Sequence, residues 1–355
     1  MEWKEILFDD FCRLNRGFDL PNNNIVEGDV PVVASSSIKA FHNVAKVKGP
    51  GVVTGRSGTL GIVQYIEQDF WPLNTSLYVK DFKGNSPKFC FYFLQMMHLE
   101  NFNAGAGVPT LNQNHLHKLK IKVPATYEGQ EKVASVLSDY DTLIDINTKR
   151  IKLLEESARE LYKEWFVRMR FPGYEQTKFV KGIPEGWTYK RVTDLLEIKY
   201  GKDHKTLEEG DYPCYGSGGI MRYVAKYLFE GESVLIPRKG SLNNIMIASE
   251  AFWTIDTMFY TIPKMKNIAK YAYYMLSSVD MESLDAGAAL PSMTTNILSN
   301  MDILLPAKGV LEQFESCLTP IFNSIEGLTK ENQTLASTRD RLLPRLLSGE
   351  LKVKA

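Results

Sequence analysis

The sequence predicts an α+β fold, with two similar globular domains in tandem pseudo-repeat that alternate with two long coiled-coil helices. Three observations support this. The chain repeats itself at a nearly constant offset, and each copy contains short apolar runs separated by turn residues. Each copy is then followed by a long segment whose apolar residues alternate in spacing between four and three, the pattern of a coiled coil.

The size and composition of the chain suit this organisation. With 355 residues it is long enough for about two domains, and its apolar (44%) and charged (24%) fractions are ordinary for a globular protein. No apolar run is long enough for a membrane span, and the start "MEWKEILFDDFC" does not resemble a secretory signal. The four cysteines form no Cys-x-x-Cys pair. We therefore expect a cytoplasmic protein with free thiols.

The internal repeat runs without a gap over most of each copy. An offset of 182 positions aligns "GDVPVVASSSI" (28–38) with "GDYPCYGSGGI" (210–220), and "AGAGVPTLNQN" (104–114) with "AGAALPSMTTN" (286–296). Upstream of these segments the offset is 184, so the first copy has two extra residues in its "DLPNNNIVEG" loop. Insertions are well tolerated in such surface loops.

Each copy is predicted to contain short strands and one short helix. The runs "VPVVAS", "GVVTG", "GIVQYI" and "SLYVKDF" in the first copy, and "SVLIP", "IMIAS" and "MFYTIP" in the second, are typical of strands. The segments "PKFCFYFLQMM" and "IAKYAYYMLSSV" are expected to form helices. The aromatic pairs Phe70-Trp71 and Phe252-Trp253 are interpreted as core anchors rather than as base-stacking surfaces.

The two long helices are predicted from their heptad seams. The first seam comprises Val133, Leu137, Tyr140, Ile144, Asn147, Ile151, Leu154, Ala158, Leu161 and Trp165. The second comprises Phe314, Leu318, Ile321, Ile325, Leu328, Asn332, Leu335, Arg339, Leu342 and Leu346. A polar seam residue fixes the register of a coiled coil, so Asn147 and Asn332 are expected to do this. Because proline is disfavoured inside a helix, Thr319-Pro320 is expected to cap the second helix and Pro344 to end or kink it.

These patterns define four segments. We predict a first domain over 1–126, a first long helix over 127–170, a second domain over 171–308 with a linker at 171–187, and a second long helix with a tail over 309–355.

A glycine-rich turn with one arginine occurs at the same place in each copy. It is "TGRSGTLG" (54–61) in the first and "PRKGSLNN" (237–244) in the second, and neither has the Gly-Lys-Ser/Thr ending of a phosphate-binding Walker loop. One interpretation is a plain hairpin turn in which Gly58 and Gly240 adopt positive φ. The other is that Arg56 and Arg238 reach guanine O6 and N7, or a phosphate, in bidentate fashion.

The segment around the first turn is positively charged. No Asp or Glu occurs between Val30 and Ile66, whereas Lys39, Lys46, Lys48 and Arg56 all lie there. The polar residues that follow the "AGAGVP" and "AGAALP" stretches either contact phosphates or cap the last strand of each copy.

We find no catalytic set and no metal site in the sequence. The pair His115-x-His117 is a weak metal motif, and surface histidines are the preferred interpretation. Glu197-Ile-Lys199, with Asp194, faintly resembles a nuclease motif, but the acid-to-Glu spacing is too short, so a solvated helix face is preferred. Neither a Gly-x-Ser-x-Gly nucleophile turn nor an Asn/Asp-Pro-Pro-aromatic tetrapeptide is present.

Over essentially its whole length the chain resembles the specificity subunit of type I restriction–modification systems. The stretches that carry the resemblance are "IKVPATYEGQEKVASVLSDYD" and "ILLPAKGVLEQFESCLTPIFNSI" where the helices begin, "LLEESARELYKEWF" and "STRDRLLPRLLSGELKV" where they end, and "GIPEGWTYKRVTDLLEI" at the start of the second domain. The Arg-turns and the "AG…P" stretches occur in both domains.

This resemblance implies a non-catalytic DNA-recognition protein. The domains would be target-recognition domains, and the long helices would pair antiparallel as a spacer. Expected partners are double-stranded DNA, two methyltransferase subunits and two restriction subunits, with no membrane. S-adenosylmethionine, ATP and Mg would be held by the partners, and this chain itself would bind no cofactor.

Candidate site residues follow from the turns and seams. Those expected to contact DNA are Ser36, Ser37, Lys39, Arg56, Ser57, Thr75, Asn112, Gly218, Arg238, Lys239, Ser241, Thr257 and Thr294. Those expected on the docking and spacer helices are Tyr140, Asn147, Leu154, Leu161, Ile325, Asn332 and Leu342.

The expected target is bipartite, with two different short sequences around an unread gap. A first helix about 60 Å long would place two readers along one duplex, whose turn is about 34 Å. The first domain has 13 basic and 11 acidic residues and the second has 15 and 16, which predicts weak DNA affinity for the chain alone. The alternatives are a coiled-coil scaffold with no DNA role and, third, a nuclease that uses Glu197 and Lys199.

Overall fold

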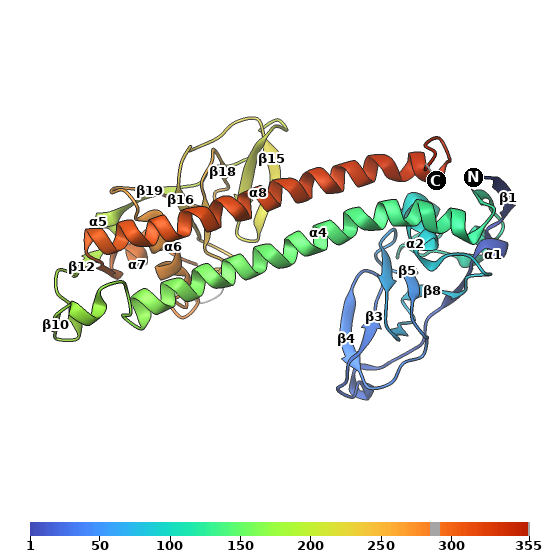
Figure 1. Cartoon of the computed structure of the whole chain (residues 1–355), viewed down its shortest axis with the longest axis horizontal. Helices are drawn as coiled ribbons and strands as arrows, with labels where there is room; N and C mark the ends of the chain where they lie inside the picture. The colour runs from blue at the N-terminus through green and yellow to red at the C-terminus, as the bar shows by residue number, and fades with distance from the viewer. Residues whose placement is uncertain (285–291, 354–355) are drawn as a thin grey trace. The chain divides into compact units, whose positions relative to one another are not determined.

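The computed structural model describes residues 1–284 and 292–353, and it divides into two units (Figure 1). The first unit contains Met1–Lys149 and Thr329–Ala355, and the second contains Arg150–Leu328. Each unit therefore holds one copy of the repeat together with a part of both long helices.

The two copies have the same sheets in the same strand order. In the first unit, a four-stranded sheet has the order β2-β8-β5-β6 and a three-stranded sheet has the order β4-β3-β7. In the second unit the corresponding orders are β13-β19-β16-β17 and β15-β14-β18. In both small sheets the last pair, β3 with β7 and β14 with β18, is parallel. The repeat in the sequence is thus a repeat of the fold.

The strands of these sheets have the following bounds. In the first unit they are β2 Arg13–Arg16, β3 Val30–Val33, β4 Ile38–His42, β5 Gly51–Gly55, β6 Val63–Ile66, β7 Trp71–Pro72 and β8 Ser76–Asp81. In the second they are β13 Leu196–Tyr200, β14 Tyr212–Gly216, β15 Gly219–Val224, β16 Ser233–Pro237, β17 Met246–Ala248, β18 Trp253–Thr254 and β19 Met258–Pro263.

A two-stranded antiparallel ribbon joins the start of each copy to its end. In the first unit β1 (Trp3–Leu7) pairs with β9 (Lys120–Pro124), and in the second β12 (Thr188–Arg191) pairs with β20 (Asp302–Leu305). The chain passes from each ribbon directly into a long helix. The hairpin of β10 (Phe179–Val180) and β11 (Ile183–Pro184) precedes the second ribbon.

Short helices complete each copy. They are α1 Phe8–Phe11, α2 Pro87–Met96 and α3 Gln113–His117 in the first unit, and α5 Val192–Leu195, α6 Ala269–Ser277 and α7 Thr295–Ser299 in the second. Helix α2 begins at a favourable N-terminus, because the Ser86 side chain accepts a hydrogen bond from the Phe89 amide and Pro87 occupies the first turn. The strands and helices expected from the apolar runs are therefore present.

The long helices are α4 (Tyr127–Tyr162), which continues into one π-helical turn over Lys163–Val167, and α8 (Lys308–Leu347). Every predicted seam residue on both helices is buried or half-buried. Within the first unit, Asn332 lies against Ile144 and Thr148, and the later Arg339 pairs with the earlier Asp141. This order of contacts makes the two helices antiparallel, as predicted.

Two prolines lie inside α8, so the expectation that Thr319-Pro320 caps the second helix was wrong. The helix begins at Lys308 and also runs past Pro344 to Leu347. Each proline removes one backbone hydrogen bond, at a cost of about 3 kcal/mol. Both prolines are exposed, so water can reach the turn that they disrupt, and burial of the seam on the other face offsets the cost.

Aromatic residues anchor the second copy to its helices. Tyr162 at the end of α4 and Trp165 and Phe166 in the π-helical turn after it pack around Phe314 of α8. The ring centroids are 4.7–6.4 Å from that of Phe314. Phe166 also meets Tyr271 of α6 at 4.8 Å. These rings form the centre of the largest hydrophobic core of the unit.

A buried ion cluster supports the same junction. The side chain of Lys270 on α6 is only 6% exposed. Its ammonium group bonds to Glu232 and to Glu315 of α8. Burial alone would lower the pKa of Lys270, but the two carboxylates outweigh it and raise that pKa.

In the first unit, a chain of polar contacts links the globular copy to both long helices. The Tyr92 hydroxyl of α2 donates to Asp141 of α4 at 2.5 Å, and Arg339 of α8 donates to the other oxygen of Asp141 at 2.5 Å. Burial, with the Asp141 contact added, strongly raises the pKa of Tyr92. Each copy is thus fastened to both of its helices.

No helix of residues 1–284 or 292–353 is long and apolar enough to cross a lipid bilayer.

Replacing Asn147 by leucine is expected to stabilise the first unit. Asn147 is 4% exposed, and its Nδ2 is buried without a hydrogen-bond partner among the described residues. Removal of this buried, unpaired donor should raise the free energy of unfolding by about 1 kcal/mol in urea titrations of the full chain. The matched control, Leu137→Asn, should lower it. A less stable N147L variant would contradict this account of the seam.

The stability of the first unit should fall as the pH drops below about 6.5, the ordinary pKa of histidine. Burial lowers the pKa of His117, and Nε2 of its neutral ring accepts a hydrogen bond from the Leu14 amide at 3.1 Å. A group with a lowered pKa contributes stability above its unfolded pKa and loses it as the pH falls through the folded one. His117→Gln should show a shallower loss between pH 7.5 and 5.5 in urea unfolding, and equal slopes would refute the assignment.

Candidate nucleic-acid interface

The Arg-turn of the first unit follows the buried strand β5 and is held on two sides. The amides of Arg56 and Ser57 donate to the Thr75 carbonyl at 2.8 and 3.1 Å. On the other side, the Leu111 amide donates to the Arg56 carbonyl at 2.8 Å. Gly58 has φ +86°, as the hairpin-turn interpretation requires.

The second unit repeats this geometry after strand β16. The Arg238 amide donates to the Thr257 carbonyl at 2.8 Å, and the Met293 amide donates to the Arg238 carbonyl at 2.9 Å. Gly240 has φ +84°. The prediction of a tight turn with positive φ at both glycines is therefore confirmed.

Both arginines have a structural task that the sequence did not reveal. Nη1 of Arg56 donates to the carbonyl of Asn74 at 3.1 Å, and Nη1 of Arg238 donates to the carbonyl of Asp256 at 2.7 Å. Each guanidinium thus fixes the neighbouring loop with part of its donor fork. The arginine is therefore part of the structure of each hairpin turn. Contact of Arg56 or Arg238 with DNA stays a prediction.

The two arginines differ in their surroundings. The guanidinium of Arg238 lies 4.8 Å from the ring centre of Tyr200 and 5.2 Å from that of Phe259, and its Nε is buried without a partner among the described residues. The residues that align with these rings in the first copy are Arg16 and Leu77. Of the two arginines, only Arg238 is therefore fixed both by a hydrogen bond to a backbone carbonyl and by contact with aromatic rings.

The serine- and glycine-rich hairpin loops lie against the Arg-turns. The Asn244 side chain donates to the Ser217 carbonyl at 2.8 Å, and a Cβ on Gly240 would come within 2.7 Å of the Ser217 hydroxyl. In the first unit, a Cβ on Gly55 of the Arg-turn would lie 3.2 Å from the Ser35 carbonyl oxygen. Contacts between these loops thus hold the predicted DNA-contacting residues of each unit in one cluster.

The predicted residues occupy this loop cluster as follows. Ser36, Ser37, Lys39, Gly218, Lys239 and Ser241 are exposed, and Arg56, Ser57, Thr75, Arg238 and Thr257 are half-buried. Asn112 and Thr294 are exposed and accept hydrogen bonds from the Asn114 and Ile297 amides at 3.0 and 3.3 Å. They therefore cap helices α3 and α7, and the expected capping of the last strand was wrong. The "AGAAL" part of the second stretch, with Pro291, lies outside the described residues.

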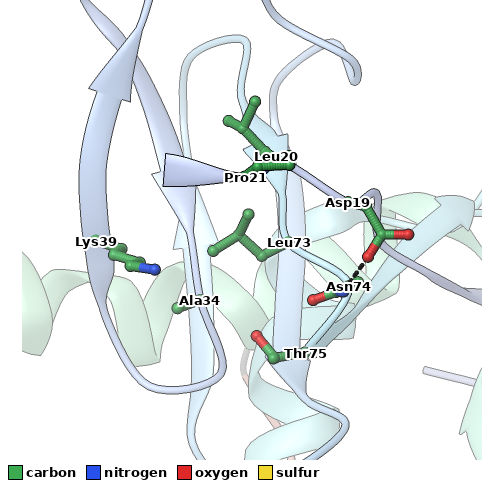
Figure 2. Close-up of a pocket in the computed structure, with 8 residues that line it drawn as sticks. All are labelled: Asp19, Leu20, Pro21, Ala34, Lys39, Leu73, Asn74 and Thr75. Carbon is green, nitrogen blue, oxygen red and sulfur yellow. Dashed lines mark hydrogen bonds between the residues drawn. The ribbon is translucent and has the colours of Figure 1, made fainter. Parts of the chain in front are cut away.

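A pocket of about 450 Å³ opens beside Lys39 in the first unit (Figure 2). Its lining residues are Asp19, Leu20, Pro21, Ala34, Lys39, Leu73, Asn74 and Thr75. Figure 2 shows Lys39 on one side of the pocket, with Asp19 and Asn74 hydrogen-bonded to each other on the opposite side. Lys39 Nζ donates to Asn22 Oδ1 at 3.0 Å, within the loop that is two residues longer in the first copy.

Several other sequence interpretations are resolved by the structure. Phe70, Trp71, Phe252 and Trp253 are at most 9% exposed, so their assignment to the core is confirmed. Glu197 and Lys199 lie on strand β13, so the helix face expected for them was wrong; they pair at 2.6 Å, and the lysine lowers the pKa of Glu197.

The histidine interpretation was wrong in part. His115 is exposed as expected, but the side chain of His117 is only 13% exposed, so His117 is not a surface histidine. Within residues 1–284 and 292–353, no three His, Cys, Asp or Glu side chains are grouped to hold a metal ion.

The predicted helix residues serve mainly to pair the helices. Tyr140, Asn147, Leu154, Leu161, Ile325, Asn332 and Leu342 are all buried or half-buried on the seam. Apolar residues beside the seam are open instead: Leu143 and Ile146 are each 46% exposed, and Leu153 is 63% exposed. None of these three was among the seven residues predicted for the docking and spacer helices.

Sequence reasoning also missed Met221, the exposed counterpart of Lys39. The offset of 182 aligns the two residues, so the repeat itself would have revealed it.

Substitution of Arg238 by alanine should destabilise its turn more than the same change at Arg56. The first change removes a backbone hydrogen bond and two aromatic contacts, for about 2 kcal/mol, and the second removes one hydrogen bond, for about 1 kcal/mol. Hydrogen exchange in the loops at 238–245 and 56–62 of the full chain measures both, with Arg238→Lys as the charge-conserving control. Equal protection in R56A and R238A would refute the asymmetry.

The chain matches known proteins over most of its length. A family model described as the type I restriction modification DNA specificity domain matches residues 1–156 and 184–336. The MjaIX specificity subunit of Methanocaldococcus jannaschii is 28% identical over 289 residues, which cover 72% of this chain and 66%, just under two thirds, of that protein. The HindI specificity subunit of Haemophilus influenzae is 20% identical over 328 residues, covering 68% and 71%.

A solved structure shares the fold. The S subunit of a type I restriction–modification system from M. genitalium superposes with a TM-score of 0.65 at 18% identity, over 98% of this chain and 96% of that chain. Together with the two family-model matches and the duplicated architecture, this leads to one conclusion. The chain belongs to the family of type I restriction–modification specificity subunits.

Proposed function

We propose that this chain recognises double-stranded DNA as the specificity subunit of a type I restriction–modification complex. Each unit reads one half of a bipartite target. The observation that carries the proposal is the duplicated loop cluster, in which the same backbone bonds hold Arg56 and Arg238 beside exposed polar turns. A scaffold protein has no need for two such matching clusters of donors.

The two halves of the target should differ in sequence. The copies share their backbone geometry, but their exposed side chains differ, with Ser36-Ser37 against Gly218-Gly219 and Lys39 against Met221. Bases are read by side-chain donors, acceptors and apolar groups. Different side chains on the same backbone geometry therefore select different bases.

Partner subunits supply most of the binding energy and all of the catalysis in this proposal. The near-balance of charge in each domain gives little electrostatic attraction to phosphates. Two methyltransferase subunits dock on the long helices, where Leu143 and Ile146 of α4 are exposed beside the seam, and two restriction subunits join them. S-adenosylmethionine, ATP and Mg belong to those partners, and this chain binds no cofactor.

Methylation mapping tests the function. In cells that carry the partner subunits, methylated adenine should occur in a two-part sequence motif only when this chain is present. Arg56→Ala should weaken the reading of one half, and Arg238→Ala the other, by about tenfold. A uniform loss at all sequences would make the arginine a phosphate contact. Absence of any chain-dependent motif would favour the scaffold function.

Binding assays test the need for partners. The purified chain alone should bind its duplex weakly at physiological salt, and addition of the methyltransferase subunits should create tight, site-specific binding. Nanomolar specific binding by the isolated chain would contradict this part of the proposal.

A further inference from the structure

One irregularity of strand pairing occurs at the same place in both units. In the hairpin of β3 and β4, Val32 pairs with Ala40 and Val33 with Ile38, which leaves Lys39 as the extra residue of a β-bulge. In the hairpin of β14 and β15, Cys214 pairs with Arg222 and Tyr215 with Ile220, which leaves Met221 as the extra residue. A bulge turns its unpaired residue out of the ladder and redirects its side chain.

The other bulge among these sheets is not duplicated. Strands β2 and β8 pair around an extra Lys80, whereas their counterparts β13 and β19 pair without interruption. The bulge at Lys39 and Met221 is therefore kept in both copies although the residue that it presents has changed.

Residues near the first bulge have counterparts at aligned positions in the second copy. Lys39 lies with Ala34, Leu73 and Asn74 around the pocket of the first unit (Figure 2). The residues that align with these three in the second copy are Gly216, Ile255 and Asp256.

The two bulge side chains lie differently within this frame. A Cβ on Gly216 would lie 2.4 Å from Met221 Sδ and 3.3 Å from Ile255 Cδ1, so the thioether packs over this glycine beside the isoleucine. Lys39 instead extends to Asn22. The frame is shared, but one bulge presents a cation with three donors and the other a flexible apolar group.

The Arg-turns beside the bulges do not differ in this way. Arg56 and Arg238 carry the same guanidinium donors, and each donates to the backbone carbonyl at the aligned position of its unit, although only Arg238 also lies against aromatic rings. The same donor group in both turns does not by itself make one unit read a different sequence from the other, so the difference must come from positions such as the bulge.

On the basis of the proposed function, we propose that Lys39 and Met221 are specificity-determining residues of the two half-sites. Lys39 donates to O6 and N7 of a guanine in the major groove. Met221, which is 57% exposed, packs against the methyl group of a thymine. These are the contacts that a lysine and an apolar side chain make with base edges.

Exchange of the two side chains tests the proposal in the assembled complex, read out by the methylated motif in cells. Lys39→Met should lower the preference for guanine at one position of the first half-site by about tenfold and leave the second half-site unchanged. Met221→Lys should replace thymine by guanine at one position of the second half-site alone. Lys39→Arg and Met221→Leu should keep the parent motif.

Lys80→Met is the matched control, because Lys80 is also an exposed lysine at a bulge but lies at the far end of β8 from the Arg-turn. It should change nothing. Thermal unfolding checks each variant, and Lys39→Gln replaces K39M if that chain is unstable. An unchanged motif in both K39M and M221K overturns the inference while the parent motif stands. A parent chain that directs no motif overturns the proposed function itself.

Discussion

The apolar seam shared by α4 and α8 is the interaction on which the rest of each unit depends. In both units a two-stranded ribbon joins the start and end of the globular copy and leads directly into a long helix. The paired helices therefore support the sheets of each unit. The seam also explains why α8 accepts Pro320 and Pro344. Side chains buried along one face hold the helix together where single backbone hydrogen bonds are missing on the other.

The two copies solve the same anchoring problem with different chemistry. The second copy uses stacked rings around Phe314, together with Lys270 and its two carboxylates. The first uses the chain from Tyr92 through Asp141 to Arg339. Buried ionic groups of this kind need both partners in place, because loss of one leaves a charge without compensation. Anchoring has therefore diverged between the copies while strand order and turn geometry have stayed the same.

Much of the fold could be predicted from local patterns and from the repeat. The heptad spacing identified the seam, the apolar runs identified the strands, and Gly58 and Gly240 identified the turns. Features that depend on contacts between distant segments could not be predicted. No local pattern indicates that Arg56 bonds to the Asn74 carbonyl. The strand at Glu197, by contrast, has the alternation of apolar and charged residues typical of a strand in "LEIKY", which the sequence interpretation overlooked. For the candidate site, the repeat pointed to the loops that the structure brings together in each unit, but strand register was needed to single out one residue within them.

A residue expelled from a β-ladder makes no cross-strand backbone pair that its replacement must preserve. Substitution at the bulge therefore carries little penalty for folding, whereas the same change one position away, at Ala40 or Arg222, alters a paired residue of the sheet. Under the proposed function of Lys39 and Met221, selection for a new DNA target would find mutations tolerated at this point while the paired strands around it keep their register. A lineage would then acquire a new target by changing one codon, without rebuilding the protein that reads it.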